Sequence, residues 1–371
     1  MVSLAAMEKA IVSVTTDYDR DPWQFNLQNG VLDLKTGKLL PHNRTRLHSK
    51  ISPVTYDAEA ACPLFEKFIN EIMAGDQEMI DFLAAAAGYS LTGDTKEQAV
   101  MVSHGNGQNG KSVFHLTLKH ILGDYAEVAS FDTFVMKKNN NGPKNDLAKL
   151  VGARVVMASE SQDGERLDEA LIKNITGGEP ITVRFLHKEF FTYDPEFKVW
   201  MSSNYKPNIK GQDWGIWRRL KLLPFEVTIP KEREDKELKA KLRNEASGIL
   251  NWMLKGLARY REQGGLIYPE KVCAATSQYR DSQDIVGQFL RAKCILTPYA
   301  EIKGAELYTS YKIWCDANRE WVMKERQFTE ALLRVSGIVT KRKQDGKWYV
   351  GVGQGGVSKP CDQLPSYMDV I

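Results

Sequence analysis

The sequence predicts an α/β fold whose central domain is a parallel sheet flanked by helices. Two observations lead to this prediction. Short apolar strands alternate with helical segments between residues 95 and 265. A glycine-rich loop, SHGNGQNGKSVFH (103–115), stands between the first of these strands and the helix that follows it. The flanking patterns differ, so we expect three domains: a small α+β and helical domain over 1–94, the core over 95–265 and a winged-helix-like domain over 266–371.

The composition is that of an ordinary globular protein. Of the 371 residues, 43% are hydrophobic and 26% charged, and the net charge of +3 does not by itself indicate a nucleic-acid partner. No apolar run approaches the ~20 residues of a membrane helix, and the N-terminus lacks the pattern of a signal peptide. The five cysteines are far apart, which argues against a disulfide framework or a zinc site. We therefore expect a cytoplasmic protein without a membrane partner.

The N-terminal domain shows hairpin signals followed by helical periodicity. FNLQNGVLDLKTGKLLPHN alternates short apolar runs with the turn pairs Asn29-Gly30 and Thr36-Gly37. From Pro63 onward, apolar residues fall at helical spacing, and a second helix is expected from about Gln77. This order predicts a small sheet before two helices.

The sequence pattern divides the central and C-terminal segments into predicted strands and helices. The expected strands are 98–105, 154–160, 197–204 and 219–227; the expected helices are 111–122 and 167–178; and a hairpin is expected over 181–195. Beyond Gly264-Gly265 we expect helices over 304–318 and 326–335, then a basic hairpin that turns at Asp345-Gly346. Helix, helix and hairpin is the order of a winged helix.

The glycine-rich loop matches the phosphate-binding pattern G-x-x-x-x-G-K-S. Its glycines let consecutive backbone N–H groups turn toward a phosphate, and the following helix adds its N-terminal dipole. Lys111 would reach the β- and γ-phosphates, and the Ser112 hydroxyl would bind Mg²⁺. The residues predicted to bind ATP are Gly105, Asn106, Gly107, Gln108, Asn109, Gly110, Lys111, Ser112 and Val113. The loop alone is compatible with a kinase, a GTPase, a packaging motor or a helicase.

Polar residues that follow the later strands supply the rest of a hydrolase site. Glu160 ends one strand and is the predicted general base and a metal ligand, although Ser159 stands where a second acid is usual. Asn204 ends another strand and would orient the attacking water. Arg218 or Arg219 would stabilise the charge of the transferring phosphoryl group, in a neighbouring subunit if the pair lies at a subunit edge.

Two basic hairpins are candidate DNA-binding elements. The first carries Arg184, His187 and Lys188, and the second carries Lys341, Arg342 and Lys343 together with Trp348 and Tyr349. Lysine and arginine bind phosphate, and aromatic rings stack on bases. The alternatives are a solvated turn for the first hairpin and, for the second, a solvated wing whose aromatic side chains face the core.

These motifs together resemble a known family. GNGQNGKS, ASE with GERLDEALIKNITGGEPITVRFLHKEF, MSSN and WRRLKLLPF are similar to the superfamily III helicases. The nearest group is the phage and plasmid primase–helicases, which are related to the poxvirus primase–helicase. NGVLDLKTGKLLPH and GYSLTGDT resemble that group's N-terminal segment, and the looser likeness of FLRAKCIL and LYTSYKIWCDAN extends to its trailing DNA-binding module.

The resemblance implies an AAA+ core that assembles as a homo-oligomeric ring, a hexamer, around single-stranded DNA with ATP between subunits. By position in the motifs, Lys173 would lie near phosphate or DNA, His187 and Lys188 would belong to the translocating hairpin, and Arg218 or Arg219 would be the arginine finger. The N-terminal domain would be the collar.

The family often carries a primase domain upstream. No acidic D-x-D or D-x-E motif stands in a strand context before residue 95. We therefore expect either a helicase-only protein or a fragment, with a primase or polymerase as partner.

The resulting hypothesis is an ATP-dependent replicative DNA helicase of a phage, plasmid or mobile element, acting in a bacterial or phage-infected cell. The alternative is an ATP-dependent DNA-binding, origin-loading or remodelling ATPase that does not unwind processively. A small-molecule kinase is a third class, but the arginine pair, the basic hairpin and the winged helix would be superfluous to it.

Overall fold

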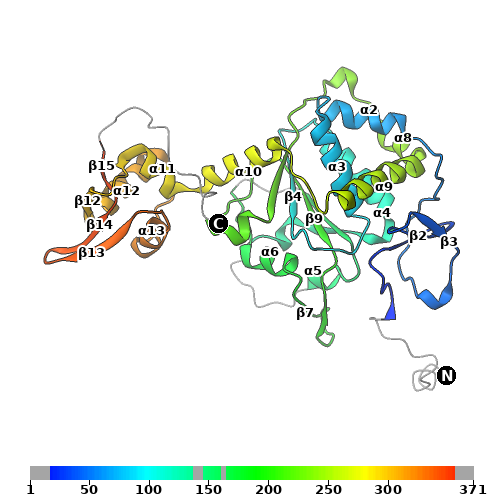
Figure 1. Ribbon diagram of the computed structural model, residues 1–371, viewed down its shortest axis with the longest axis horizontal. Helices are drawn as coiled ribbons and strands as arrows, with labels where there is room; N and C mark the ends of the chain where they lie inside the picture. Colours follow the sequence, from blue (N-terminus) through cyan, green and yellow to red (C-terminus); the bar gives the residue numbers. More distant parts are fainter. Residues whose placement is uncertain (1–16, 137–144, 160–163, 356–371) are drawn as a thin grey trace. The chain divides into compact units, whose positions relative to one another are not determined.

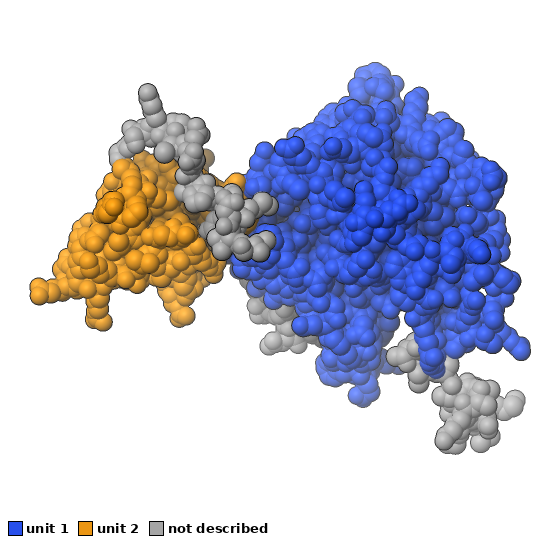
Figure 2. Space-filling model, in the orientation of Figure 1, with its two compact units in different colours: residues 1–279 blue, residues 280–371 orange. Residues whose placement is uncertain are grey.

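The computed structural model describes residues 17–136, 145–159 and 164–355. The chain forms two compact units, residues 1–279 and 280–371 (Figure 2), and the division falls within α10 (Glu270–Gln283). Each unit contains a hydrophobic core of its own. The domain boundaries near residues 94 and 265 stay predictions. In the described part, no helix is both long and apolar enough to cross a membrane.

Unit 1 begins with the expected small sheet and two helices. An antiparallel meander consists of β1 (Gln24–Leu27), β2 (Gly30–Asp33) and β3 (Lys38–Leu40). The helices are α2 (Pro63–Ile72) and α3 (Gln77–Tyr89). Pro63 occupies the first helical position, where no backbone donor is needed, and the Asp76 carboxylate caps α3 by accepting from the Met79 N–H.

A five-stranded sheet forms the centre of unit 1, and all its neighbouring strands are parallel. Its order is β10 (Leu220–Pro224), β4 (Val100–His104), β9 (Lys198–Ser203), β6 (Val155–Ser159) and β5 (Ala126–Ser130). This confirms the predicted parallel sheet. β5 was not predicted, because its residues AEVAS form no apolar run.

Helices cover both faces of this sheet, which makes three layers (Figure 1). Along β9, Trp200 joins one core while Val199 and Met201 join the other, as the alternation of a strand requires. The Trp200 core also contains residues of the N-terminal meander, of α3, of α4 (Lys111–Leu122) and of α9 (Ala246–Glu262). The opposite core contains residues of α5 (Asn145–Ala148), α6 (Glu169–Thr176) and α7 (Trp214–Trp217). Before α9 comes the short α8 (Leu238–Asn244).

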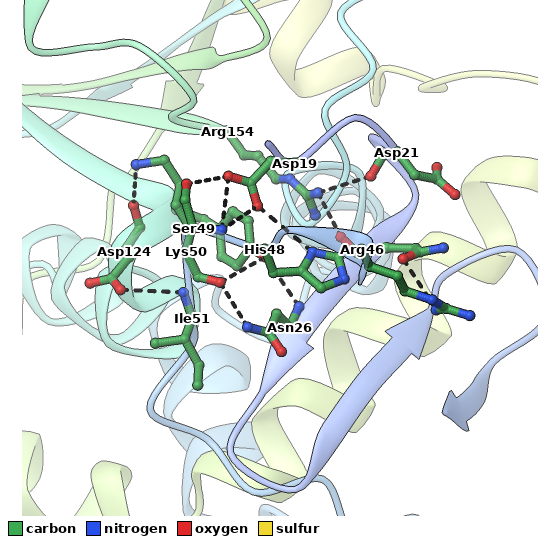
Figure 3. Close-up of polar contacts among 12 residues, drawn as sticks. Asp19, Asp21, Asn26, Arg46, His48, Ser49, Lys50, Ile51, Asp124 and Arg154 are labelled. Carbon is green, nitrogen blue, oxygen red and sulfur yellow. Dashed lines mark hydrogen bonds and ion pairs between the residues drawn. The ribbon is translucent and has the colours of Figure 1, made fainter. Parts of the chain in front are cut away.

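A polar cluster ties the N-terminal segment to the sheet (Figure 3). Arg154, buried just before β6, donates to the carbonyl oxygens of Gln24 and Leu91 at 2.6 Å each. Its guanidinium lies 4.4 Å from the centre of the Tyr125 ring, and burial lowers its pKa. The Asp124 carboxylate accepts from the backbone N–H of Ile51 at 3.2 Å. These contacts explain why the meander belongs to unit 1.

The remaining elements are one hairpin of unit 1 and the elements of unit 2. β7 (Ile181–Val183) and β8 (Phe191–Tyr193) form the first hairpin as expected. Unit 2 contains α11 (Ile285–Lys293), β11 (Cys294–Ile295), β12 (Glu301–Lys303), α12 (Gly304–Asn318), α13 (Glu325–Leu332), β13 (Val339–Lys343), β14 (Gly346–Val350) and β15 (Gly353–Gln354). Its three-stranded sheet has the order β12-β14-β13, and its other two strands, β11 and β15, pair with each other. The predicted basic hairpin is therefore β13 and β14.

Candidate nucleotide and nucleic-acid site

The glycine-rich loop lies at the carboxyl end of β4, between β10 and β9. Ligands bind at this edge of parallel sheets where neighbouring connections diverge. Gly110, the N-cap residue of α4, has a φ of +80°, in the left-handed region that an L side chain rarely adopts. A Cβ atom on Gly105 would stand 2.2 Å from the side-chain Nδ2 of Asn109 and 2.2 Å from the backbone carbonyl oxygen of Phe225. The backbone therefore has the close turn that a phosphate cradle needs.

Lys111 is held at the centre of this loop by three oxygen atoms. Its Nζ donates to the Gly105 carbonyl at 2.6 Å, to Asn109 Oδ1 at 3.1 Å and to Asn204 Oδ1 at 3.0 Å. The lysine is 4% exposed, and desolvation lowers its pKa to about 8. Among the described residues, no carboxylate is paired with it. A buried cation held by neutral oxygens suits an incoming anion.

Asn204 and Ser112 complete the described part of the site. Asn204 follows β9, the neighbour of β4, and its hydrogen bond to Lys111 joins the two predicted residues. Asn109, buried within the loop, donates to the Phe225 carbonyl at 3.2 Å and so fastens the loop to the segment after β10. Ser112 is exposed in the first turn of α4, where its hydroxyl is accessible to a metal ion. Asn106 and Gln108 are exposed on the same loop, and Val113 is half-buried.

The predicted general base and metal ligand Glu160 lies outside the described residues. The structure describes the strand before it: β6 ends at Ser159, which is exposed and pairs in register with Ser202 of β9. β6 is therefore the direct neighbour of β9, the strand before Asn204, and β9 separates it from β4, the strand before the loop.

The two arginines have different surroundings. Arg219 is 8% exposed; its Nε donates to the Thr176 hydroxyl at 3.0 Å and its Nη1 donates to the Gly215 carbonyl. Arg218 is half-buried and donates to the Gln98 side chain. Because Arg219 is engaged inside the fold, Arg218 is the member of the pair with a partly accessible guanidinium.

The Lys173 ammonium is paired within its own unit. Its Nζ lies 2.8 Å from Asp213 Oδ1, and this partner holds the pKa of Asp213 below its usual range against the effect of burial. Asp213 also caps α7 by accepting from the Ile216 N–H at 3.3 Å. Lys173 therefore has a structural partner in addition to its predicted place near phosphate or DNA.

The β7–β8 hairpin presents its predicted residues at an exposed tip. His187, with a φ of +60°, and Lys188 are both exposed. Arg184 is half-buried, and its guanidinium lies 4.6 Å from the centre of the Phe190 ring. Phe185, Leu186 and Phe190 are exposed as well. The tip thus combines charge with apolar surface.

The C-terminal hairpin carries paired and unpaired cations. Lys341 and Lys343 both form ion pairs with Glu301 on β12, and the Lys343 ammonium lies 3.9 Å from the centre of the Trp348 ring. Arg342 points to solvent and forms no ion pair with any described residue. Of the three predicted DNA-binding cations here, only Arg342 is uncompensated.

Two residues were not predicted from the sequence: His115, near the loop, and Gln98, before β4 at the opposite edge of the sheet. His115 is buried one turn after Lys111, and its Nε2 lies 3.0 Å from the Ser103 hydroxyl on β4. Burial lowers its pKa to about 4, so it is neutral. A histidine on the apolar face of a helix was the available signal. For Gln98, the partner of Arg218, the sequence offered no signal, because it stands just before β4 and belongs to no recognisable motif.

Two family models match this chain. One, described as D5 N terminal like, matches residues 1–74, and the other, a family of unknown function (DUF5906), matches residues 103–219. The second match begins within β4, just before the glycine-rich loop, and ends at the arginine pair. It therefore contains the described candidate site of unit 1.

Viral proteins and one solved structure are similar over most of the chain. "Putative helicase L207/L206" of Acanthamoeba polyphaga mimivirus is 27% identical over 324 residues, which is 81% of this chain and 34% of the viral protein. A protein of African swine fever virus (isolate Warthog/Namibia/Wart80/1980) named as a putative primase is 23% identical over 331 residues, 81% of this chain and 34% of its own length. The chain spans about a third of these relatives.

The solved structure is the apo C-terminal region of NrS-1. It has a TM-score of 0.52 at 10% identity and covers 96% of this chain and 91% of that one, a likeness of fold. The resemblance to the primase–helicase family is confirmed: the chain has a D5 N-terminal-like segment and is related to proteins of large DNA viruses named as helicases and primases.

Proposed function

We propose that this chain is the ATPase part of a replicative DNA helicase, which hydrolyses ATP between subunits of a ring that moves along single-stranded DNA. The observation that carries the proposal is the position of Lys111, buried at the carboxyl edge of the sheet and held by Asn204 from the neighbouring strand. This is the geometry of a site that receives a phosphate and places a polar side chain beside it.

The position of Arg218 supports hydrolysis between subunits. β10 pairs in parallel with β4 from Leu220↔Val100 to Pro224↔His104, so Arg218 precedes the strand at the amino edge of the sheet. Five residues of strand, roughly 16 Å, separate that edge from the loop. The arginine is therefore far from the loop of its own chain, and the loop of a second copy is the one it would serve.

The chain's own residues would divide the chemistry among them. The N–H groups of the loop and the charge of Lys111 would bind and orient the phosphates, and Asn204 would orient the attacking water. Glu160 would accept the proton of that water. Mg²⁺, when bound with ATP, would neutralise phosphate charge, and the exposed Ser112 hydroxyl would help to hold it.

Two elements support a DNA partner. The exposed tip of the β7–β8 hairpin brings Lys188 and His187 together with apolar side chains. In unit 2, the order α11, β12, α12, α13, β13, β14 with the sheet order β12-β14-β13 supports a winged-helix-like module. Arg342 on its hairpin is the cation best placed to bind a phosphate.

The test compares ATP hydrolysis with strand separation. Single-stranded DNA is expected to raise the ATPase rate, and Lys188→Ala should keep the basal rate and lose unwinding of a forked duplex. Glu189→Gln, at the same exposed tip, is the matched control and should unwind normally. Stimulation by DNA without unwinding in the parent chain would favour a remodelling ATPase, and a rate indifferent to DNA would refute the DNA-coupled motor.

A further inference from the structure

An exposed tryptophan stands beside the accessible arginine. Trp214, the first residue of α7, is 63% exposed, whereas Trp217 in the same turn is 3% exposed. Trp217 packs edge-on against Tyr279 with ring centres 5.2 Å apart. No ring contact or hydrogen bond of the Trp214 side chain is found among the described residues. Trp217 therefore packs inside the fold, whereas the Trp214 side chain is exposed to solvent.

Trp214 and Arg218 lie on the same side of this turn. They are four residues apart, and the Arg218 N–H donates to the Trp214 carbonyl at 3.0 Å, which closes one helical turn. Ile216, Trp217 and Arg219 are buried behind them. One small surface thus carries a large exposed aromatic ring and a guanidinium.

The turn is braced on three sides. Arg219 donates to Thr176 of α6 and to the Gly215 carbonyl within the turn. Lys173 of α6 holds Asp213, the residue that caps the turn. The Trp217 indole donates to the Gly211 carbonyl at 2.8 Å. A surface held this rigidly loses little conformational entropy on association, which favours a protein interface.

We infer that Trp214 is the anchor by which this face binds a second copy of the chain, setting Arg218 against the nucleotide of that copy. The inference rests on the proposed function, because it assigns an assembly residue to the same intersubunit site. Tryptophan and arginine are the side chains most enriched at the energetic centres of protein interfaces.

A second copy is favoured over other occupants of this face by the needs of Arg218. In the proposed mechanism an arginine stabilises the transferring phosphoryl group. Arg218 stands at the opposite edge of the sheet from the loop of its own chain. The nucleotide bound to the loop of a second copy would give Arg218 a phosphate to contact. The face also contains Asp213, beside Lys173, so it is not a uniformly basic surface of the kind that binds DNA.

The first experiment measures assembly of the full chain with a non-hydrolysable ATP analogue by sedimentation over a range of protein concentrations. Trp214→Ala should raise the concentration needed for assembly by about tenfold or more, and Trp214→Phe should restore most of the loss. Tyr299→Ala, which removes a 94% exposed ring in unit 2, is the matched control and should assemble normally. Thermal melting checks that each variant is folded.

The second experiment tests whether Trp214 is needed on the subunit that supplies the arginine or on the subunit whose loop binds the nucleotide. Lys111→Ala and Arg218→Ala are each expected to be inactive, and their mixture should regain ATPase activity because one subunit lends its arginine to the other's loop. Adding Trp214→Ala to the Lys111→Ala chain, the arginine donor, should abolish this rescue. Adding it to the Arg218→Ala chain should leave the rescue intact.

The outcomes separate the two ideas. If Trp214→Ala assembles and complements like the parent in both arrangements, the anchor is wrong although the intersubunit site stands. If Arg218→Ala alone keeps full activity, the arginine assignment of the proposed function fails, and the assembly curves still decide the anchor. If Trp214→Ala weakens only DNA binding, the face binds DNA bases and the inference is overturned. A parent chain that stays monomeric refutes both.

Discussion

The protonation of Lys111 depends on its buried position in the glycine-rich loop. Three neutral oxygens hold the ammonium, and no carboxylate of the described residues pairs with it. Burial removes the ammonium from water and favours loss of its proton, which lowers the pKa of Lys111 to about 8. An incoming phosphate would reverse this effect by favouring the charged form. The same residue thereby links nucleotide binding to pH.

Nucleotide affinity should accordingly fall at alkaline pH. Below pH 8 the free site already carries the proton, so affinity should change little. Above pH 8 the free lysine is neutral while the bound one is charged, so binding takes up a proton and weakens by up to about tenfold per pH unit. Lys111→Arg, which stays protonated, should show no such decline. Calorimetric titration between pH 7 and 9.5 measures this, and a flat parent profile would contradict the assignment.

At the scale of elements, α3 and α9 pack closely in unit 1. Gly88 of α3 faces the α9 backbone, where a Cβ atom would stand 2.3 Å from the Leu257 nitrogen. Gly256 of α9 faces α3, where a Cβ atom would stand 1.9 Å from the Ala84 carbonyl oxygen. The two helices therefore approach backbone to backbone over the core that also contains α4. This pair supports the helix that begins at Lys111.

Gly256→Ala should destabilise the protein although alanine is the better helix former. In a free helix the exchange would stabilise by about 0.8–1.0 kcal/mol. Here the added methyl group forces α3 and α9 apart, and we expect a net loss of about 1–3 kcal/mol in the free energy of unfolding. Urea denaturation measures the change. Lys255→Ala, at the exposed neighbouring position, is the control, and an unchanged or increased stability of Gly256→Ala would disprove the close approach.

At the scale of the whole molecule, the chain consists of two units with separate cores. Unit 2 is built around aromatic side chains: Phe328 is fully buried and stacks on Tyr311 with ring centres 4.5 Å apart. No residue of this core belongs to the two cores of unit 1. Damage to one core should therefore leave the other folded.

Phe328→Ala provides the test of this independence. Removing the ring should destabilise unit 2 by about 3–5 kcal/mol and weaken DNA binding, while the basal ATPase of unit 1 is retained. Leu333→Ala, at a side chain 42% exposed just after α13, is the control and should change little. Calorimetry of the full chain should show one transition shifted down and another unchanged. A joint shift of both transitions would show that the units unfold as one.

The sequence alone determined those features that local chemistry dictates. The glycine-rich loop, the strand before it and the helix after it follow from glycine conformation and apolar periodicity, and α4 lies at the predicted residues 111–122. The family resemblance was carried by these same motifs. Asn204 was predicted to lie beside the loop, because parallel strands end at a common edge, and it contacts Lys111.

Other features were decided only by tertiary structure, because they depend on which surfaces meet. The sequence left Arg218 and Arg219 equivalent; packing against Thr176 buries one and leaves the other accessible. It likewise treated Lys341, Arg342 and Lys343 as one basic group, until pairing of β12 with β14 brought Glu301 to two of them. Charge and residue type are local properties of a chain, but burial and pairing come from segments distant in sequence, which only the fold brings together.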